Sequence, residues 1–267
     1  MEGAACGYLE FNKAIIDAVC DIVPAVKPQC AYYEVLGWQG IRCLAETIAY
    51  AHQKGMYVIT DGKRNDIGST MQAYAAAHLG EMEIEGVRCT PFGADALTVN
   101  GYLGTDGIQP LLDLIRGKND KAIFVLAKTS NPSSGELQDK KIDGEPVYAA
   151  MGAMCERWGE GSRGRYGYSQ VGAVVGATYP EQLFELRRKL PHTFFLVPGY
   201  GAQGGGAKDV AGAFDQNGLG AVVNSSRAIL TAWKKEGWSE ETYTQAARAE
   251  AIRMRDDITS AIPPMRG

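Results

Sequence analysis

The chain has 267 residues, 45% hydrophobic and 22% charged, with a formal net charge of −4 at pH 7. This is the composition of an ordinary globular protein, and the slightly acidic balance without a dense Lys/Arg tract argues against nucleic acid as a partner. Without a bilayer-length apolar run or a signal-peptide pattern, we expect a cytoplasmic protein that does not bind membranes. The six cysteines lack CxxC or zinc-like spacing, so we expect reduced thiols.

Strand-like and helix-like patterns alternate along the whole chain. A helical pattern at 10–19 is followed by a short apolar segment, 22–26, and by a helix at 37–54. The β-branched and aromatic run 56–59 is typical of a buried strand. Further strands are predicted at 96–100, 122–126, 171–175, 194–197 and 221–223, and further helices at 71–79, 107–116, 147–158, 179–190, 208–214 and 240–258.

This alternation predicts a parallel sheet covered by helices. A polar or glycine-rich sequence follows each of the seven predicted strands, at Lys27, Asp61/Lys63, Asn100, Lys128/Thr129, Thr178, Gly199/Gly201 and Asn224/Arg227. An open doubly wound sheet also fits the alternation, but a barrel draws its site from the carboxyl ends of many strands. We therefore expect a (β/α)₈ barrel forming a single domain over residues 1–267, with seven visible strands where eight are expected.

The stretch 60–70, TDGKRNDIGST, places two carboxylates, two cations and an amide within six residues. In an extended segment Asp61 and Lys63 lie on the same face because side chains alternate with period two. An acid and an amine at a strand's carboxyl end indicate chemistry. A solvated turn with a surface ion pair fits the stretch equally well when it is taken alone.

The segment 199–204, GYGAQG, matches GxGxxG after a predicted strand. A dinucleotide site also needs an acid at the end of the next strand, and that strand continues into NSSR at 224–227, so the Rossmann interpretation fails. Glycine-flanked backbone N–H groups beside Arg227 suit a phosphate, as in the loops after the last two strands of many barrels. Tight turns next to a surface arginine are the alternative.

Two other features have open interpretations. In 128–132, KTSNP, hydroxyl and amide groups fit either the reading of a polar ring edge or the capping of a turn. The polar connection 132–144 is a candidate lid or an ordinary surface loop. His52, His78 and His192 lie on helices or on a helix-to-strand connection, so we expect solvated histidines and no histidine catalysis.

The stretch 61–68, together with Lys27, PGYGAQ at 198–203 and NSSR at 224–227, resembles the orotidine 5′-phosphate decarboxylase family. The resemblance runs from about residue 11 to residue 258 and is strongest to the longer bacterial subfamily (type 2). It implies a homodimeric (β/α)₈ barrel that converts orotidine 5′-phosphate to UMP and CO₂ in de novo pyrimidine biosynthesis. It also implies that no metal and no organic cofactor takes part.

The resemblance assigns catalytic roles to matching residues. Lys63 is expected to protonate C6 within an alternating charged array of Lys27, Asp61, Lys63 and Asp66. Asp66 and Thr70 are expected to project into the partner subunit's site. A fixed ammonium beside C6 would stabilise the negative charge that develops there as CO₂ departs.

The resemblance also implies a binding set. Ser130 is expected to read the pyrimidine edge, and Gln203 to bridge base and phosphate. Arg227 and the backbone around Gly201 and Gln203 are expected to hold the phosphate. Remote phosphate binding would supply energy that positions the base.

Three departures from the family pattern stand out. The family's first strand ends in a Gly-Leu-Asp-type motif whose acid holds the ribose, and nothing before residue 11 matches it. Gly62 replaces a usually apolar residue, and Gly101 stands where proline is more usual. We therefore expect the first strand to be missing from this chain and Met1 to be an internal start.

Other functions compete with decarboxylation. A nucleotide-binding remnant would keep the phosphate grip but lack catalysis, because the first strand and its acid are absent. A Mg²⁺-dependent barrel enzyme using Asp61 and Asp66 is disfavoured by the two lysines beside them. A Schiff-base aldolase using Lys63 or Lys128 is weaker still, because flanking carboxylates would keep Lys63 protonated and non-nucleophilic.

Overall fold

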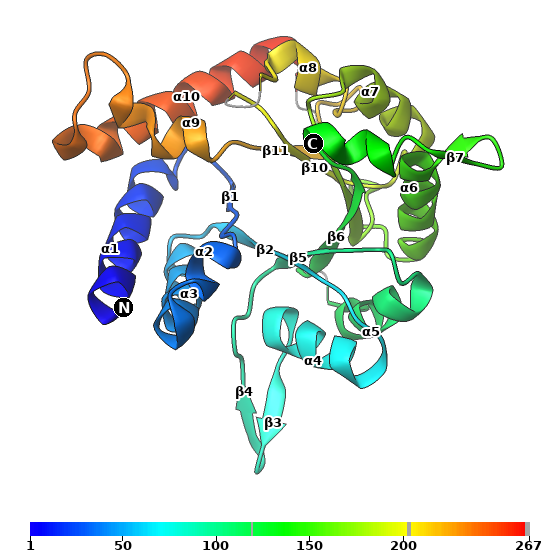
Figure 1. The fold of residues 1–267 in the computed structure, drawn as a ribbon, viewed down its shortest axis with the longest axis horizontal. Helices are drawn as coiled ribbons and strands as arrows, with labels where there is room; N and C mark the ends of the chain where they lie inside the picture. The colour runs from blue at the N-terminus through cyan, green and yellow to red at the C-terminus, as the bar shows by residue number, and fades with distance from the viewer. Residues whose placement is uncertain (119, 202–203, 265–267) are drawn as a thin grey trace.

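The computed structural model describes residues 1–118, 120–201 and 204–264. Its centre is a curled, parallel seven-stranded sheet in the order β1-β2-β5-β6-β9-β10-β11 (Figure 1). The strands are β1 (Ala25–Val26), β2 (Tyr57–Arg64), β5 (Ala96–Val99), β6 (Ala122–Lys128), β9 (Val171–Val175), β10 (Phe195–Pro198) and β11 (Ala221–Asn224). Every one of them overlaps a predicted strand, so the predicted alternation is confirmed.

Helices form the outer layer around the sheet (Figure 1). The longer ones are α1 (Glu2–Val19), α3 (Gly37–Gln53), α4 (Gly68–Leu79), α5 (Thr105–Ile115), α6 (Val147–Trp158), α7 (Pro180–Lys189) and α10 (Tyr243–Ala261). Shorter ones are α2 (Ala31–Glu34), α8 (Ala207–Ala211), α9 (Arg227–Leu230) and the 3-10 turns η1 (Pro132–Glu136), η2 (Ala232–Lys234) and η3 (Glu240–Thr242). The helix α1 begins earlier than the pattern at 10–19 predicts.

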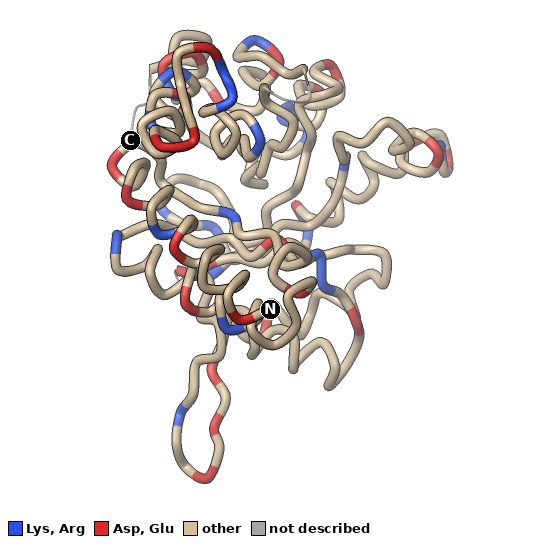
Figure 2. The backbone as a smooth tube through the Cα atoms, turned by 60° about the vertical axis from the view of Figure 1, so that its left-hand side comes forward, with Lys and Arg blue, Asp and Glu red and all other residues tan. Residues whose placement is uncertain are grey.

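Two antiparallel hairpins were not predicted. β3 (Met82–Ile84) pairs with β4 (Val87–Cys89), and this hairpin projects from the body of the molecule (Figures 1 and 2). β7 (Lys141–Ile142) pairs with β8 (Glu145–Pro146) at the end of the polar connection after β6. Figure 2 shows basic and acidic residues interspersed along the backbone. None of the described helices has the length and apolarity needed to cross a bilayer.

Alternation along the strands creates two apolar layers. One face contributes a compact inner cluster of Ile59, Ala96, Phe124, Val174 and Leu196, one residue from each of the five central strands. The other face packs beneath the helices, where Leu97 and Ile123 join residues of α4 to α7 in the main core. The inner cluster fills the concave side of the sheet, as expected for a barrel-type fold.

Helices continue the outer layer beyond the two edges of the sheet. Among the described residues, β1 and β11 are the two edges of the sheet. Outside them α1 packs against both α3 and α10 (Figure 1). Arg248 of α10 donates to the Ala18 carbonyl over 2.9 Å and to the Asp21 carboxylate over 2.6 and 2.8 Å. The predicted architecture, a barrel-type fold with seven strands, is therefore present.

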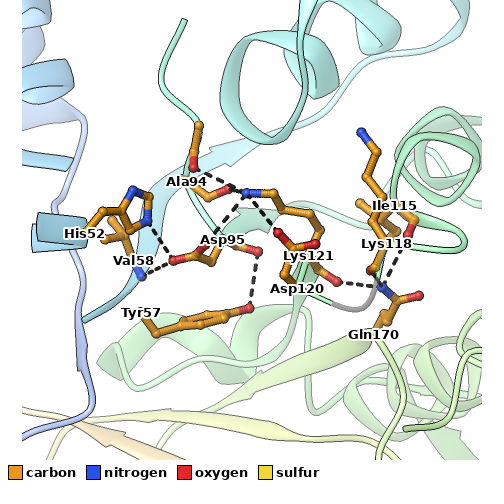
Figure 3. Close-up of polar contacts among 11 residues, drawn as sticks. His52, Tyr57, Val58, Ala94, Asp95, Ile115, Lys118, Asp120, Lys121 and Gln170 are labelled. Atoms are coloured by element: carbon orange, nitrogen blue, oxygen red, sulfur yellow. Dashed lines mark hydrogen bonds and ion pairs between the residues drawn. The ribbon is translucent and has the colours of Figure 1, made fainter. Parts of the chain in front are cut away.

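A polar network joins the amino ends of neighbouring strands, at the opposite end of the sheet from the predicted site (Figure 3). Asp95 precedes β5, and its Oδ2 accepts the Val58 N–H over 2.7 Å and lies 2.9 Å from His52 Nε2. Lys121 donates to the Ala94 carbonyl over 2.8 Å. Gln170 donates in turn to the Lys121 carbonyl over 2.8 Å. The network fixes β2, β5, β6 and β9 relative to one another.

His78 corrects one prediction, because it is buried rather than solvated. Its side chain on α4 is 4% exposed, and its ring lies 5.1 Å from the ring of Phe92. The segment after the projecting hairpin covers it, since the Phe92 and Ala94 N–H groups donate to the Ala77 and His78 carbonyls. Burial lowers the pKa of the His78 imidazole to about 4, and the nearby Arg64 guanidinium acts in the same direction.

Candidate active site

Three of the predicted charged residues meet at the carboxyl ends of β1 and β2. Lys27 directly follows β1, while Asp61 and Lys63 lie on β2. The Asp61 carboxylate forms ion pairs with both lysines: Oδ2 contacts Lys27 Nζ, and Oδ1 lies 2.5 Å from Lys63 Nζ. Thr98 of β5 donates its hydroxyl to the same Oδ1 over 2.8 Å. A single carboxylate is thus held between two ammonium groups.

A bulge in β2 produces this convergence. Thr60 is paired with Leu97 and Arg64 with Val99, so residues 61–63 together lie opposite Thr98 alone. Lys63 has a left-handed backbone with φ of 48°, and its N–H donates to Thr98 Oγ1 over 3.0 Å. The regular extended segment assumed from the sequence is therefore wrong in detail, although Asp61 and Lys63 do face each other. Such strain in a non-glycine residue is typical of functional sites.

Burial differs across the array. The side chains of Lys27 and Asp61 are 13% and 8% exposed, whereas that of Lys63 is 45% exposed. Burial alone would raise the pKa of the Asp61 carboxyl, but the Lys27 and Lys63 ammonium groups outweigh it and leave the pKa below its ordinary value. Asp61 is therefore a fixed negative charge, and Lys63 is its partner on the open side.

Neighbouring side chains fill the space beside both Gly62 and Gly101. A Cβ on Gly62 would lie 3.3 Å from Leu97 Cδ1 and 3.4 Å from Cys30 Sγ, so these side chains occupy the available space. At Gly101 a Cβ would lie only 2.6 Å from Met151 Sδ and 2.9 Å from Val125 Cγ1. Neither glycine opens a gap beside the charged residues.

Asp66 and Thr70 lie apart from these three residues. The Asp66 carboxylate accepts the Ile67 N–H over 2.7 Å, and within the described part of the chain it forms no ion pair. Thr70 is exposed in the first turn of α4. The structure therefore unites three members of the predicted four-residue array within one chain.

The other predicted binding residues follow β6, β10 and β11. Ser130 comes two residues after β6, and its carbonyl accepts the Thr178 hydroxyl over 3.3 Å. Gly201 has φ of 77°, and a Cβ there would lie 3.4 Å from Ala228 Cβ, so its loop adjoins the start of α9. Arg227 is exposed at that start. Gln203 lies outside the described residues.

Sequence reasoning missed two supports of this site. Thr98 binds both Asp61 and Lys63, and its only signal is a hydroxyl within an otherwise apolar strand. Tyr200, inside the glycine-rich loop, donates to Asp257 of α10 over 2.5 Å. No local pattern connects residues so distant in the sequence.

Residues 9–241 match the family described as Orotidine 5'-phosphate decarboxylase / HUMPS family. The chain belongs to this family. It is 49% identical over 261 residues to orotidine 5'-phosphate decarboxylase of Rhodopirellula baltica, covering 96% of this chain and 85% of the relative. It is 44% identical over 253 residues to that of Clostridium perfringens, covering 94% and 84%.

Solved structures agree with this assignment. A putative orotidine 5'-phosphate decarboxylase from Streptomyces avermitilis superposes with a TM-score of 0.78 at 34% identity, covering 96% of this chain and 83% of that one. The predicted activity in pyrimidine biosynthesis and the predicted class, a carboxy-lyase, are confirmed. The alternative of a catalytically impaired remnant is not favoured.

Proposed function

We propose that Lys63 is the proton donor in the decarboxylation of orotidine 5′-phosphate. The bond between C6 and the carboxylate breaks, its electron pair stays on C6, and CO₂ leaves. Lys63 Nζ then donates a proton to C6 to give UMP, and solvent restores the ammonium. The supporting observation is the Lys27–Asp61–Lys63 arrangement, in which a buried carboxylate fixes an exposed ammonium. A preorganised positive charge stabilises the carbanion as it forms.

We further propose that the other strand ends hold the nucleotide. Ser130 reads the pyrimidine edge, and Gln203 bridges base and phosphate. Gly201 and Arg227 bind the phosphate, which is supported by the close approach of their two loops. Both oxygens of Asp61 are engaged by lysines, which argues against a role for Asp61 as a Mg²⁺ ligand.

A lysine substitution tests the proposed proton donor. For Lys63→Ala we expect turnover of orotidine 5′-phosphate to fall by about a thousandfold or more, with a much smaller loss of UMP binding. Lys54→Ala is the matched control, because Lys54 is a partly exposed lysine that pairs with Asp17 near the amino end of β2. Equal turnover by Lys63→Ala and the unaltered protein, followed as loss of substrate absorbance, would refute the assignment.

The active form is proposed to be a cytoplasmic homodimer in which Asp66 and Thr70 enter the partner subunit's site. In support, Ile67, Tyr102 and Leu103 are exposed apolar residues in the loops after β2 and β5. These loops adjoin, because the Asn100 N–H donates to the Arg64 carbonyl over 3.2 Å.

Mixing two inactive variants tests the shared site. After unfolding and refolding together, Lys63→Ala and Asp66→Ala should regain up to about a quarter of normal turnover, because half of the dimers are mixed and each has one intact site. Each variant refolded alone is the control. If the mixture stays as inactive as the separate variants, Asp66 acts within its own subunit.

A further inference from the structure

Lys128, at the end of β6, is a fully buried lysine outside the Lys27–Asp61–Lys63 array. Its side chain is 0% exposed. A register shift against β9 occurs between Leu126 and Lys128. Lys128 Nζ lies 4.4 Å from the ring centre of Tyr179 and 5.7 Å from that of Tyr148 on α6. An ammonium in such surroundings is costly unless it is paired and hydrogen-bonded.

Both polar partners of Lys128 come from the loop that follows its own strand. Its Nζ donates to Asp139 Oδ1 over 2.7 Å and to Ser134 Oγ over 3.2 Å. Asp139 also lies 3.4 Å from Gln182 Nε2 of α7. Lys128 therefore links the loop to the end of β6. Removing Asp139 would leave the buried Lys128 ammonium without its anionic partner, so the pair should hold the loop in place.

The same loop is closed at its base by a second pair of contacts. Gln138 Oε1 accepts the Thr129 N–H over 2.9 Å, and Gln138 Nε2 donates to the Thr129 hydroxyl over 2.7 Å. Thr129 immediately precedes Ser130, so the backbone is fixed on that side.

The end of β9 supports Ser130 on its other side. Thr178 Oγ1 donates to the Ser130 carbonyl over 3.3 Å. Gly176 approaches so closely that an added Cβ would lie 2.9 Å from Ser130 Cβ and 3.0 Å from its Cα. The Gly176 N–H donates to the Lys128 carbonyl over 2.8 Å. Ser130 is thus held between a lysine-anchored loop and a neighbouring strand.

We propose that Lys128, Ser134 and Asp139 form a latch, with Lys128 and Ser134 buried and Asp139 at the surface, that positions Ser130 for recognition of the pyrimidine. Lys128 is then a positioning residue for base selectivity and does not contact substrate. The proposal rests on the proposed role of Ser130 in reading the base. Breaking the latch should therefore weaken binding of the base and leave binding of the phosphate unchanged.

The test compares two ligands that differ in the base. UMP and ribose 5-phosphate are titrated calorimetrically into the unaltered protein, into Lys128→Met and into the matched control Lys121→Met. Lys121 immediately precedes β6 at the opposite end and is also largely buried, at 13% exposure. We expect Lys128→Met to weaken UMP binding by about tenfold and ribose 5-phosphate binding by less than about twofold. Lys121→Met should change the ratio of the two affinities little.

Asp139→Asn provides a second variant, since it keeps an oxygen for Lys128 but removes the charge, and it carries the test if Lys128→Met does not fold. It should shift the ratio of the two affinities in the same direction. In a Ser130→Ala background, Lys128→Met should cause little further loss of UMP affinity, because the latch acts through Ser130. Equal losses for both ligands, an unchanged UMP affinity, or additive effects of the two substitutions would each overturn the latch.

These binding ratios separate the latch from the proposed catalytic function. Unaltered protein that binds UMP but does not turn over orotidine 5′-phosphate would contradict the proposed catalysis, and the two-ligand comparison would still decide the latch. If Ser130→Ala leaves UMP affinity unchanged while Lys128→Met lowers it, positioning through Ser130 is wrong.

Discussion

At the scale of single residues, Thr98 contacts both the left-handed backbone of Lys63 and the carboxylate of Asp61. Its hydroxyl accepts the Lys63 N–H and donates to Asp61, and the residue is 1% exposed. One hydroxyl therefore stabilises both the left-handed conformation of Lys63 and the orientation of the carboxylate beside it. Both contacts are made to other residues of the candidate site, so we propose that Thr98 is a positioning residue.

Replacing Thr98 by valine removes both hydrogen bonds while keeping the shape of the side chain. We expect kcat to fall by about ten- to a hundredfold, while UMP affinity changes by less than about threefold, because the proposed phosphate and base contacts stay in place. Thr98→Ser should restore most of the activity. Steady-state kinetics with UMP inhibition measure both quantities, and an unchanged kcat for Thr98→Val would contradict this role.

The buried imidazole of His78 gives the fold a dependence on pH. Its pKa falls from 6.5 in the unfolded chain to about 4 in the folded state, so only the unfolded state gains this proton between these values. The free energy of unfolding should therefore decrease by about 1.4 kcal/mol per pH unit as pH falls through this window, from this residue alone. Above pH 6.5 the imidazole is neutral in both states, so His78 no longer lowers the free energy of unfolding there.

Urea unfolding at pH 7 and pH 5 measures this effect. We expect His78→Gln to have lower stability at pH 7 but a smaller loss of stability between the two pH values than the unaltered protein. His52→Gln, at a partly exposed histidine, is the comparison variant. Identical slopes for His78→Gln and the unaltered protein would contradict the assignment.

At the scale of elements, the two ends of the sheet have separate tasks. The carboxyl ends of β1 and β2 carry the charged residues, whereas the amino ends are joined by the network around Asp95 (Figure 3). In parallel barrels the carboxyl-end loops build the site and the opposite end contributes to stability. Substitutions at the two ends should therefore affect different measurements.

Asp95→Ala tests the stabilising role of the amino-end network. It leaves the Val58 N–H without its acceptor and removes the partner of His52, so we expect a loss of about 1–3 kcal/mol of unfolding free energy. The kcat at 25 °C should stay within about twofold of normal, because no proposed substrate-binding residue moves. Asp120→Ala, at a side chain 72% exposed, is the control. A large fall in kcat would show that the two ends are coupled.

The sequence predicted elements better than their details. All seven strands of the main sheet could be predicted, because the alternation of strand-like and helix-like patterns is visible within each short segment of the sequence. The bulge at residues 61–63, the burial of His78 and the Lys128–Asp139 ion pair depend on partners at least eleven residues away, namely Thr98, Phe92 and Asp139. Pairing register and coverage by distant segments are absent from a local pattern.

At the scale of the whole molecule, the sheet is well paired in its middle and weakly covered at its edges. β5 and β9 are buried at every position, whereas β1 and β11 are only partly buried. Each edge strand is paired on one side among the described residues. We propose that residues 1–267 still unfold as one domain, because α1, α3 and α10 share a continuous apolar core with β2.

Hydrogen exchange on the 267-residue polypeptide tests this gradient. Amides of β5, β6 and β9 should exchange only through global unfolding, and those of β1 and β11 should exchange faster through local opening, because the edges have fewer buried contacts. α10 serves as the internal reference for the outer layer. Uniform protection across all seven strands would contradict a weak edge.

The left-handed backbone of Lys63 predicts which amino acids selection for folding and selection for activity would each favour at this position. Glycine and asparagine adopt φ near 48° more comfortably than lysine, so Lys63→Gly should give a fold at least as stable as Lys63→Ala. Neither replacement can donate a proton from an ammonium. In a mutational library sorted for folding, Gly and Asn should therefore become enriched at this position, whereas sorting for growth on endogenous pyrimidine synthesis should retain lysine. If Lys63 is the proton donor as proposed, turnover rather than stability keeps lysine here.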